Sequence, residues 1–104
     1  MNWKVKYSES SMQDLLDIGD YISDILLEPF TAKEQVGRIM DAVESLDNMP
    51  FRCPRYDRGK WKDSEIRFLT IDNYIILYLP DEINAIVKIV RIFYSGRNIE
   101  QLNK

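Results

Sequence analysis

The last third of the chain, Ile66 to Asn98, most constrains the fold. It holds three runs rich in β-branched and aromatic residues, separated by turn signals at Asp72-Asn73 and at Pro80 to Glu82, and such a pattern predicts an antiparallel meander. Arg67 and Arg91 interrupt otherwise apolar runs within it. Because a strand arginine is costly to bury unpaired, each forms an ion pair, reaches the rim or faces an open cleft that binds an anion. The open cleft is our working hypothesis.

A strand and two helices are expected before the meander. Trp3 to Tyr7 alternates apolar and basic residues, which is typical of a short strand with one face on a core. Apolar residues at spacings of three and four predict one helix from Met12 to Leu26, after N-cap candidates at Ser8 to Ser11, and a second from about Thr31 to about Leu46. Pro29 stops the first helix or begins the second.

The predicted order of elements is therefore β-α-α-β-β-β, in a single domain that covers residues 1–104. A helical hairpin must cover its apolar side, and one face of the sheet provides that cover. We expect an α+β fold in which an antiparallel sheet carries the αα-hairpin on one face and leaves the other face exposed. Residues 51–63 show no helical period and are rich in Arg, Lys, Pro, Gly and aromatic residues, so we expect an irregular basic loop there.

The residue types that are missing exclude several classes of site. The chain contains no histidine and one cysteine, Cys53. Catalysis by Ser-His-Asp, Cys-His or His-metal groups, an internal disulfide and a multi-cysteine zinc site are therefore excluded. No metal or organic cofactor is implied. The apolar runs are far shorter than the roughly 20 residues of a membrane span, and the first residues lack a signal-peptide core, so a cytoplasmic protein without membrane partners is expected.

The charges are distributed unevenly along the chain. The net charge is −3, but residues 1–50 hold 4 basic and 10 acidic residues, whereas residues 51–67 hold 6 basic and 3 acidic ones. The aspartates of the first helix, among them Asp14 and Asp17, read as a solvated face. The basic segment leads into the strand of Arg67. It predicts a local positive patch, which attracts phosphate.

A set of motifs in a particular order carries a family resemblance over nearly the whole chain. The motifs are Tyr7-Ser8-Glu9-Ser10, Asp14-Leu15-Leu16-Asp17-Ile18, Asp20-Tyr21-Ile22, Leu46 to Pro50, Ile66-Arg67-Phe68-Leu69, Asn73 to Tyr78, and Val90 to Arg97. Each is mostly a hydrophobic pattern, whereas the ordered set resembles the RelE/ParE family of toxins from bacterial type II toxin-antitoxin modules. The fold of that family agrees with the order of elements derived above.

The resemblance implies a toxin that inhibits growth, with a role in plasmid stabilization, and a cognate antitoxin as its partner. A helix and an extended segment of the antitoxin are expected to wrap the toxin and cover the arginine face. Members similar to RelE cut messenger RNA in the ribosomal A site, as mRNA interferases. Members similar to ParE poison DNA gyrase. The leading prediction is a ribosome-dependent, metal-independent endoribonuclease.

Candidate site residues follow from the chemistry of RNA cleavage. Attack by a 2′-hydroxyl on the neighbouring phosphate requires a base, stabilisation of the charged transition state and a proton for the leaving oxygen. The resemblance places Arg67 and Arg91, on strands expected to be neighbours, as a bidentate clamp for the phosphate, and Tyr94 as a functional tyrosine. The candidates for RNA binding are Arg58, Lys60, Lys62 and Arg97. Tyr56 and Trp61 either stack on bases or cover the edge of the core.

Each assignment has an alternative. Arg67 and Arg91 alternatively pair with carboxylates of the protein or of an antitoxin. Strict alternation points Tyr94 away from Arg91, so its participation requires a bulge or a turn beginning at Phe93, a position where some nuclease members have histidine. The acidic balance also departs from the strongly basic toxins that dock into ribosomal RNA. A gyrase inhibitor without nuclease activity and an inactive interaction domain therefore remain as alternatives.

Overall fold

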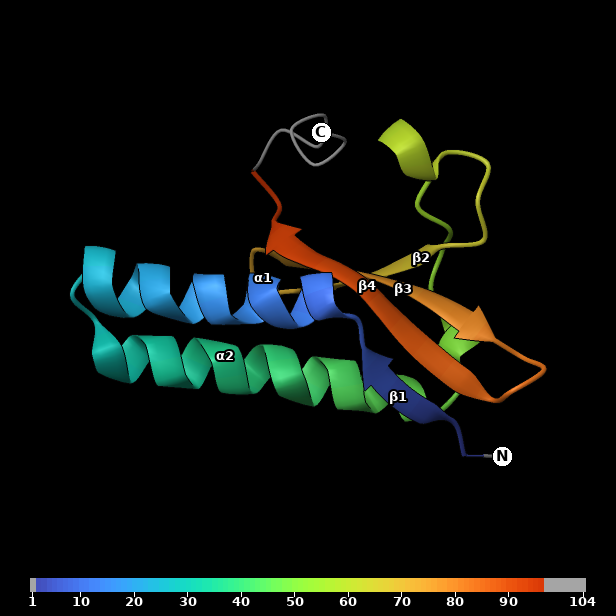
Figure 1. Cartoon of the computed structure of the whole chain (residues 1–104), viewed down its shortest axis with the longest axis horizontal. Coiled ribbons are helices and arrows are strands. Elements are labelled where there is room, and N and C mark those ends of the chain that lie inside the picture. Colours follow the sequence, from blue (N-terminus) through green and yellow to red (C-terminus); the bar gives the residue numbers. More distant parts are fainter. Residues whose placement is uncertain (1, 97–104) are drawn as a thin grey trace.

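The computed structural model describes residues 2–96 and shows a four-stranded sheet with two helices on one face (Figure 1). The elements are β1 (Lys4–Tyr7), α1 (Glu9–Asp20), α2 (Pro29–Glu44), β2 (Arg67–Ile71), β3 (Tyr74–Asp81) and β4 (Ile86–Tyr94). The predicted α+β class and the predicted order β-α-α-β-β-β are confirmed.

The strand order in the sheet is β1-β4-β3-β2. The meander of β2, β3 and β4 is antiparallel, as predicted, but β1 pairs with β4 in parallel, from Lys4 opposite Ile86 to Tyr7 opposite Ile89. The sheet is therefore mixed, and the prediction of an antiparallel sheet is wrong for this one pair. A period of two shows which side chains share a face of a strand, and it carries no information on the direction of the neighbouring strand.

Ser8 joins the start of α1 to the sheet. Its hydroxyl oxygen accepts a hydrogen bond from the Ser11 N–H and donates one to the Val90 carbonyl oxygen, both at 3.0 Å. The first bond caps the helix, since it satisfies an N–H group that has no partner inside the helix. The second ties the cap to β4, where the pairing with β1 has just ended.

The first helix continues beyond Asp20 as a π-helix, Tyr21–Ile25, in which the Leu26 N–H donates to the Tyr21 carbonyl oxygen. The chain then turns at Leu27, whose φ of 57° is unusual for a bulky residue. Pro29 occupies the first position of α2, where its missing N–H costs nothing, so the second of its two predicted roles is the correct one.

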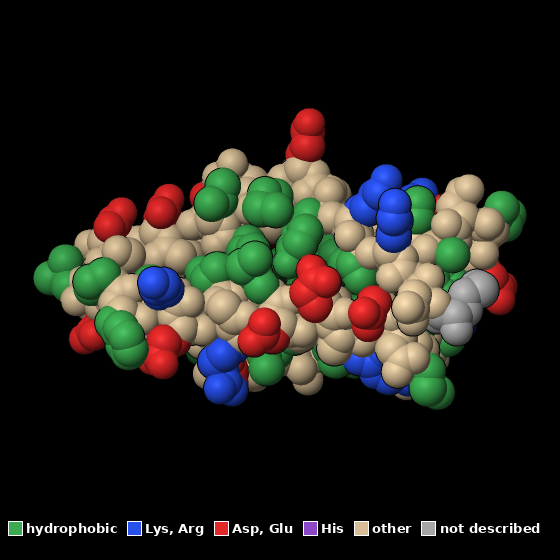
Figure 2. Space-filling model, turned by 90° about the horizontal axis from the view of Figure 1, so that it is seen from below, with side chains coloured by type: hydrophobic (Ala, Val, Ile, Leu, Met, Phe, Trp, Pro, Cys, Tyr) green, Lys and Arg blue, Asp and Glu red, His purple; other side chains and the backbone are tan. Residues whose placement is uncertain are grey.

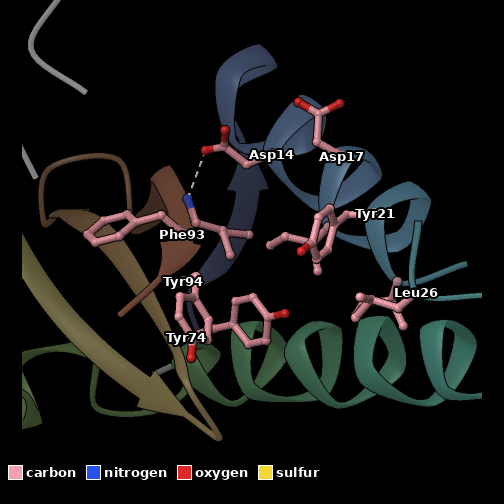
Figure 3. Close-up of a pocket in the computed structure, with 10 residues that line it drawn as sticks. Asp14, Asp17, Tyr21, Leu26, Tyr74, Phe93 and Tyr94 are labelled. Atoms are coloured by element: carbon pink, nitrogen blue, oxygen red, sulfur yellow. Dashed lines mark hydrogen bonds between the residues drawn. The ribbon is translucent and has the colours of Figure 1, made fainter. Parts of the chain in front are cut away.

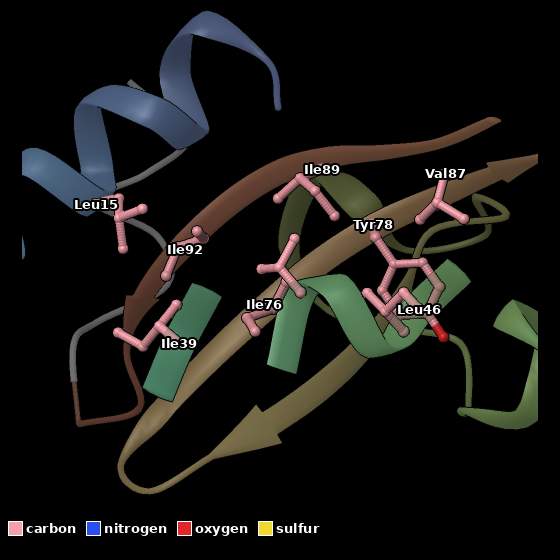
Figure 4. Close-up of a cluster of buried hydrophobic side chains, with 9 residues drawn as sticks. Leu15, Ile39, Leu46, Ile76, Tyr78, Val87, Ile89 and Ile92 are labelled. Carbon is pink, nitrogen blue, oxygen red and sulfur yellow. The ribbon is translucent and has the colours of Figure 1, made fainter. Parts of the chain in front are cut away.

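The main core lies between the two helices and the sheet (Figure 4). Its buried members come from α1, α2, the 3-10 turn after α2, β3 and β4: Leu15, Ile39, Val43, Leu46, Ile76, Tyr78, Val87, Ile89 and Ile92. The Tyr78 hydroxyl donates to the Pro50 carbonyl oxygen at 2.6 Å, so this buried phenol has a hydrogen-bond partner. Burial raises the pKa of this phenol, which stays protonated and serves as a donor.

The other face of the sheet is not left exposed, contrary to the prediction. The loop between α2 and β2 passes the edge of β2 and folds across this face, where Tyr56 and Trp61 are buried against Leu77 and Phe93. Backbone hydrogen bonds from Tyr56 N to Ile66 O and from Phe68 N to Pro54 O hold this loop against β2. Of the two alternatives stated for Tyr56 and Trp61, the structure shows the covering role.

The helical hairpin extends past the sheet, and its tip is uncovered (Figure 1). Ile25, Leu27 and Phe30 are 66%, 77% and 71% exposed at this tip. Figure 2 shows hydrophobic side chains at this end of the molecule, on the left, with both acidic and basic side chains around them. In the described part of the chain, none of the helices combines the length and the apolar character needed to cross a membrane.

Candidate functional site

Arg91 is held by a carboxylate of α1. Its Nε and Nη2 atoms donate to Oδ2 and Oδ1 of Asp14 at 2.7 and 2.9 Å, and Oδ2 also accepts the Ile92 N–H at 2.9 Å. These bonds raise the pKa of the guanidinium. The strand β1 ends opposite Ile89, so α1 supplies the partner that the edge of β4 would otherwise lack. For Arg91 the structure therefore shows the ion pair, one of its predicted alternatives.

Arg67 secures the beginning of the loop that covers the sheet. Its Nη1 atom donates to the carbonyl oxygens of Cys53 at 2.5 Å and of Phe51 at 3.3 Å. The guanidinium carbon also lies 5.1 Å from the centre of the Phe51 ring, within the range of a cation–π contact. The observed contacts of Arg67 are thus internal to the protein.

The two arginines are not brought together. Arg67 pairs with Tyr78 and Arg91 pairs with Leu77, which are consecutive residues of β3. Because consecutive side chains of a strand point to opposite faces, the two arginines lie on opposite faces of the sheet, with β3 between their strands. The expectation that their strands are neighbours is wrong. In this arrangement they do not converge on a single phosphate.

Tyr94 is likewise separated from Arg91. The strand β4 does contain a bulge, but the register shifts between the pairs Tyr78–Ile89 and Leu77–Arg91, before Arg91, and the pairing from Arg91 to Tyr94 is regular. Tyr94 therefore points to the helix side of the sheet. There its ring meets that of Tyr74 edge to face, with the ring centres 5.8 Å apart.

The charges of the basic loop have divided roles. Arg52 donates to carbonyl oxygens of residues that follow α2, including that of Asn48 at 2.6 Å, and Arg55 lies 3.5 Å from Glu65. The expected RNA-binding residues Arg58, Lys60 and Lys62 are exposed on this loop, with Lys60 Nζ 5.0 Å from the centre of the Trp61 ring. Arg97, the fourth of them, lies outside the described residues.

Sequence reasoning did not predict a groove that lies between the first helix and the sheet (Figure 3). On the sheet side, the start of β3 and the end of β4 line it. Its volume is about 710 Å³. The lining consists of three tyrosines, two aspartates and apolar side chains: Asp14, Asp17, Ile18, Tyr21, Ile22, Leu26, Tyr74, Ile92, Phe93 and Tyr94. In Figure 3, Tyr21 lies across the groove from Tyr74 and Tyr94, with Asp17 above it on the helix. We call this feature the tyrosine groove.

The chemistry of the tyrosine groove differs from that of an anion site. The pKa of Tyr74 is raised, mainly by partial burial and to a smaller extent by the nearby acidic groups of Tyr94, Asp72 and Tyr21. Tyr74 therefore stays protonated at neutral pH. Among the described residues, the lining of the groove includes no lysine and no arginine.

One signal in the sequence could have indicated the groove. Asp17 and Ile18 lie three and four positions after Asp14, and Tyr21 lies four and three positions after them, so the four residues share a side of the helix that is neither fully apolar nor fully charged. The π-helix that begins at Tyr21 is a second indication, because such segments occur frequently at functional sites. Within residues 2–96, no group of three or more His, Cys, Asp and Glu side chains is placed to hold a metal ion.

Comparison with known proteins gives one consistent result. The model of a family described as the ParE toxin of the type II toxin-antitoxin system parDE matches residues 5–99. Among curated proteins, no sequence matches the chain.

Several solved structures share the fold, among them three toxin-antitoxin systems or complexes. The chromosomal ParDE toxin-antitoxin system from P. aeruginosa is similar at 20% identity with a TM-score of 0.74, over 88% of this chain and 95% of that one. The RelBE2 toxin-antitoxin complex from Mycobacterium tuberculosis follows, with 17% identity, a TM-score of 0.62, and 90% and 99% of the two chains. The RelE-RelB complex from Pyrococcus horikoshii OT3 has 13% identity and a TM-score of 0.62, over 94% and 100%.

Proposed function

The chain belongs to the ParE toxin family of type II toxin-antitoxin systems, and from this premise we propose that it arrests bacterial growth by binding DNA gyrase rather than by cutting RNA. The sequence favoured a ribosome-dependent nuclease. The geometry of the candidate site shifts the preference toward the alternative that sequence reasoning left open.

The separation of Arg67 and Arg91 carries this proposal. A nuclease without histidine depends on cations that meet at the phosphate, where they stabilise the charge that develops in the transition state. Here the two expected phosphate ligands lie on opposite faces of the sheet, and each is bonded to groups of the protein itself. Tyr94 is on the face opposite Arg91. Inhibition through protein contacts does not require these three side chains to meet at one point.

The surface also suits contacts with proteins. Exposed apolar side chains gather at the tip of the helical hairpin, among them Ile25, Leu27 and Phe30, and a contiguous apolar surface rimmed by polar residues marks a protein interaction site. The acidic balance of residues 1–50 disfavours nucleic acid as the ligand of this end of the molecule. Gyrase is the protein target that the family resemblance implies.

A cognate antitoxin completes the proposal. The structures of similar fold are toxin-antitoxin systems or complexes, which supports a partner of the same kind for this chain. The antitoxin would occupy surface that gyrase needs and so prevent toxicity. Both partners act in the cytoplasm, the compartment predicted from the sequence.

Ribosome-dependent cleavage of messenger RNA is the second candidate. Arg58, Lys60 and Lys62 favour it, because they are exposed cations on one loop and suit contacts with phosphate. In that mechanism the 2′-hydroxyl attacks without a metal ion, and Arg67, Arg91 and Tyr94 keep the roles that the resemblance assigns to them. It requires a rearrangement that frees both arginines from their internal partners.

Induced expression in a bacterial host separates the candidates. Plasmid DNA is examined for gyrase-dependent breaks, and cellular messages are mapped by primer extension in the same cultures. We expect trapped gyrase breaks and intact messages. Discrete cuts inside translated codons, without gyrase breaks, would overturn the proposal, and neither lesion would indicate an inactive interaction domain.

A paired variant tests the basic loop directly. The double variant Lys60→Ala/Lys62→Ala removes two loop cations, and Lys4→Ala/Lys6→Ala removes two exposed cations of β1. A gyrase inhibitor that docks through the hairpin end keeps its toxicity in both. Selective loss of toxicity and of ribosome binding in the loop variant would instead support the nuclease.

A further inference from the structure

The tyrosine groove is built from two elements that are far apart in sequence. The first helix contributes Asp17 and Tyr21, and the sheet contributes Tyr74 and Tyr94 (Figure 3). Tyr21 and Tyr94 are 55% and 52% exposed, although neither is needed to close the main core. These half-exposed aromatic side chains line a cavity of about 710 Å³ and are accessible to a ligand that binds in it.

The charge at the groove is negative. Two carboxylates line it, and Asp14 is already neutralised by its bidentate pair with Arg91. Asp17 is exposed, and its Oδ1 atom accepts a hydrogen bond from the neutral amide of Gln13 at 2.8 Å. The negative charge of Asp17 is therefore uncompensated among the lining residues, none of which is basic in the described part of the chain.

Aromatic faces beside a carboxylate are a known way to recognise a cation. The face of an aromatic ring is negative and attracts an ammonium or guanidinium group within about 6 Å, and a carboxylate adds a charge-assisted hydrogen bond. An anion in the same place would meet Asp17, and no basic side chain among residues 2–96 lines the groove to balance that charge. The apolar floor formed by Ile18, Ile22 and Ile92 suits the aliphatic stem of such a side chain.

We propose that the tyrosine groove binds the side chain of an arginine or lysine presented by the antitoxin, with Asp17 as its anionic partner and Tyr21, Tyr74 and Tyr94 around its stem and charge. This inference rests on the proposed function, since it names a contact of the antitoxin. It assigns the acidic first helix a role in partner selection, where the sequence indicated only a solvated face. A partner segment without a basic residue at this point binds more weakly.

The primary test uses two synthetic probes. One is a capped pentapeptide with a central arginine flanked by leucines. The other has citrulline in place of arginine, which keeps the shape and removes the charge. Titrations are followed by NMR on the purified toxin. We expect the arginine peptide to shift resonances of Tyr21, Tyr74 and Tyr94 and to bind on the order of tenfold more tightly than the citrulline peptide.

Variants of the toxin test whether the preference for the arginine peptide depends on the Asp17 carboxylate. Asp17→Asn removes the proposed anion and keeps the size of the side chain, and Asp24→Asn is the matched control, because Asp24 is exposed on the π-helix and does not line the groove. We expect Asp17→Asn to abolish the preference for arginine over citrulline and Asp24→Asn to retain it. Equal binding of the two peptides by the wild-type toxin would overturn the inference and identify an apolar segment as the occupant. No shift at the groove with either peptide would also overturn it.

A separate measurement distinguishes this inference from the proposed function. The protein encoded beside the toxin gene is titrated against wild-type, Asp17→Asn and Asp24→Asn toxins at two salt concentrations. Weaker binding with a smaller salt dependence for Asp17→Asn alone supports the groove contact. Equal binding by all three refutes the contact and leaves the toxin-antitoxin function intact. No binding and no neutralisation of the wild-type toxin would refute the proposed partner itself.

Discussion

Asp14 and Arg91 are 77 positions apart in the chain, yet they form a bidentate ion pair that links α1 to β4. The same carboxylate accepts the Ile92 N–H, so one side chain satisfies both a guanidinium and the open edge of a strand. The side chains of Asp14 and Arg91 are only 11% and 23% exposed. A pair of this kind is expensive to break from one side, because the remaining charge stays partly buried without a partner.

We expect Asp14→Ala to lower the free energy of unfolding by about 3 kcal/mol. Asp20→Ala, an exposed aspartate at the end of the same helix, changes it by less than about 0.5 kcal/mol. Urea unfolding followed by circular dichroism measures both. Arg91→Ala is expected to be destabilising as well. If Arg91→Ala abolished toxicity without any loss of stability, the arginine would act on the target directly, and the nuclease candidate would gain.

Asp72 predicts a loss of stability in acid. It accepts hydrogen bonds from Arg38 at two atoms and from Gln35, and these bonds lower its pKa from 3.8 to about 2. Because the pKa is lower in the folded state, the contribution of Asp72 is complete above about pH 4 and is lost as the pH falls toward 2.

Thermal unfolding of the wild type and of Asp72→Asn between pH 2 and pH 7 checks this. The wild type should be the more stable protein at neutral pH, and the difference should shrink below pH 4. Added salt should shrink it at every pH, since the pair is exposed. A difference that does not depend on pH would show that the Asp72 carboxylate is not the origin of the effect.

Trp61 tests whether the basic loop is a structural cover. Its side chain is 5% exposed and packs with Tyr56 over the second face of the sheet. We expect Trp61→Ala to cost about 3 kcal/mol of stability, because the substitution leaves a cavity and removes a large buried surface. Lys62→Ala, at the exposed neighbouring position, is the control and should be nearly neutral. A loss below about 1 kcal/mol for Trp61→Ala would mean that the loop is detached in solution.

Two glycines in helices should respond differently to alanine. A Cβ atom at Gly37 meets nothing within 4 Å, so Gly37→Ala should stabilise the protein by up to about 1 kcal/mol through helix propensity alone. At Gly19 the added atom would lie 3.2 Å from Val36 Cγ2 of the facing helix. The gain at Gly19 should therefore be smaller or absent, and thermal midpoints compare the two variants. A larger gain at Gly19 would contradict the close helix contact.

The helices and strands were predictable because burial imposes a period on the sequence. The spacing of Leu15, Ile39 and Val43 marks the buried sides of two helices, and all three are in the core. The meander was predictable for the same reason, through its alternation. Both periods are local, because each can be recognised within about ten residues of the chain.

The candidate site was much less predictable, because it depends on contacts between distant segments. Nothing in the sequence around Asp14 or Arg91 indicates that the two residues form an ion pair. The burial of Trp61 follows from the need to cover Leu77 and Phe93, and that need arises only once the sheet exists. Two of the failed predictions, the neighbouring arginine strands and the direction of β1, concern strand order and strand direction. The third, the exposed second face, failed because the loop with Tyr56 and Trp61 folds over the sheet.

The parallel pair of β1 and β4 has a consequence for biosynthesis. Ser8 bonds to Val90 across 82 positions, and within residues 2–96 β1 pairs with no strand other than β4. A growing chain therefore cannot complete its sheet until residues 86–94 have been synthesised and have left the ribosome, although the two helices are already present. The half-made chain lacks the strand that holds Arg91, Tyr94 and one wall of the tyrosine groove. Until that strand has emerged, the apolar sides of the two helices lack the part of the core that β4 supplies.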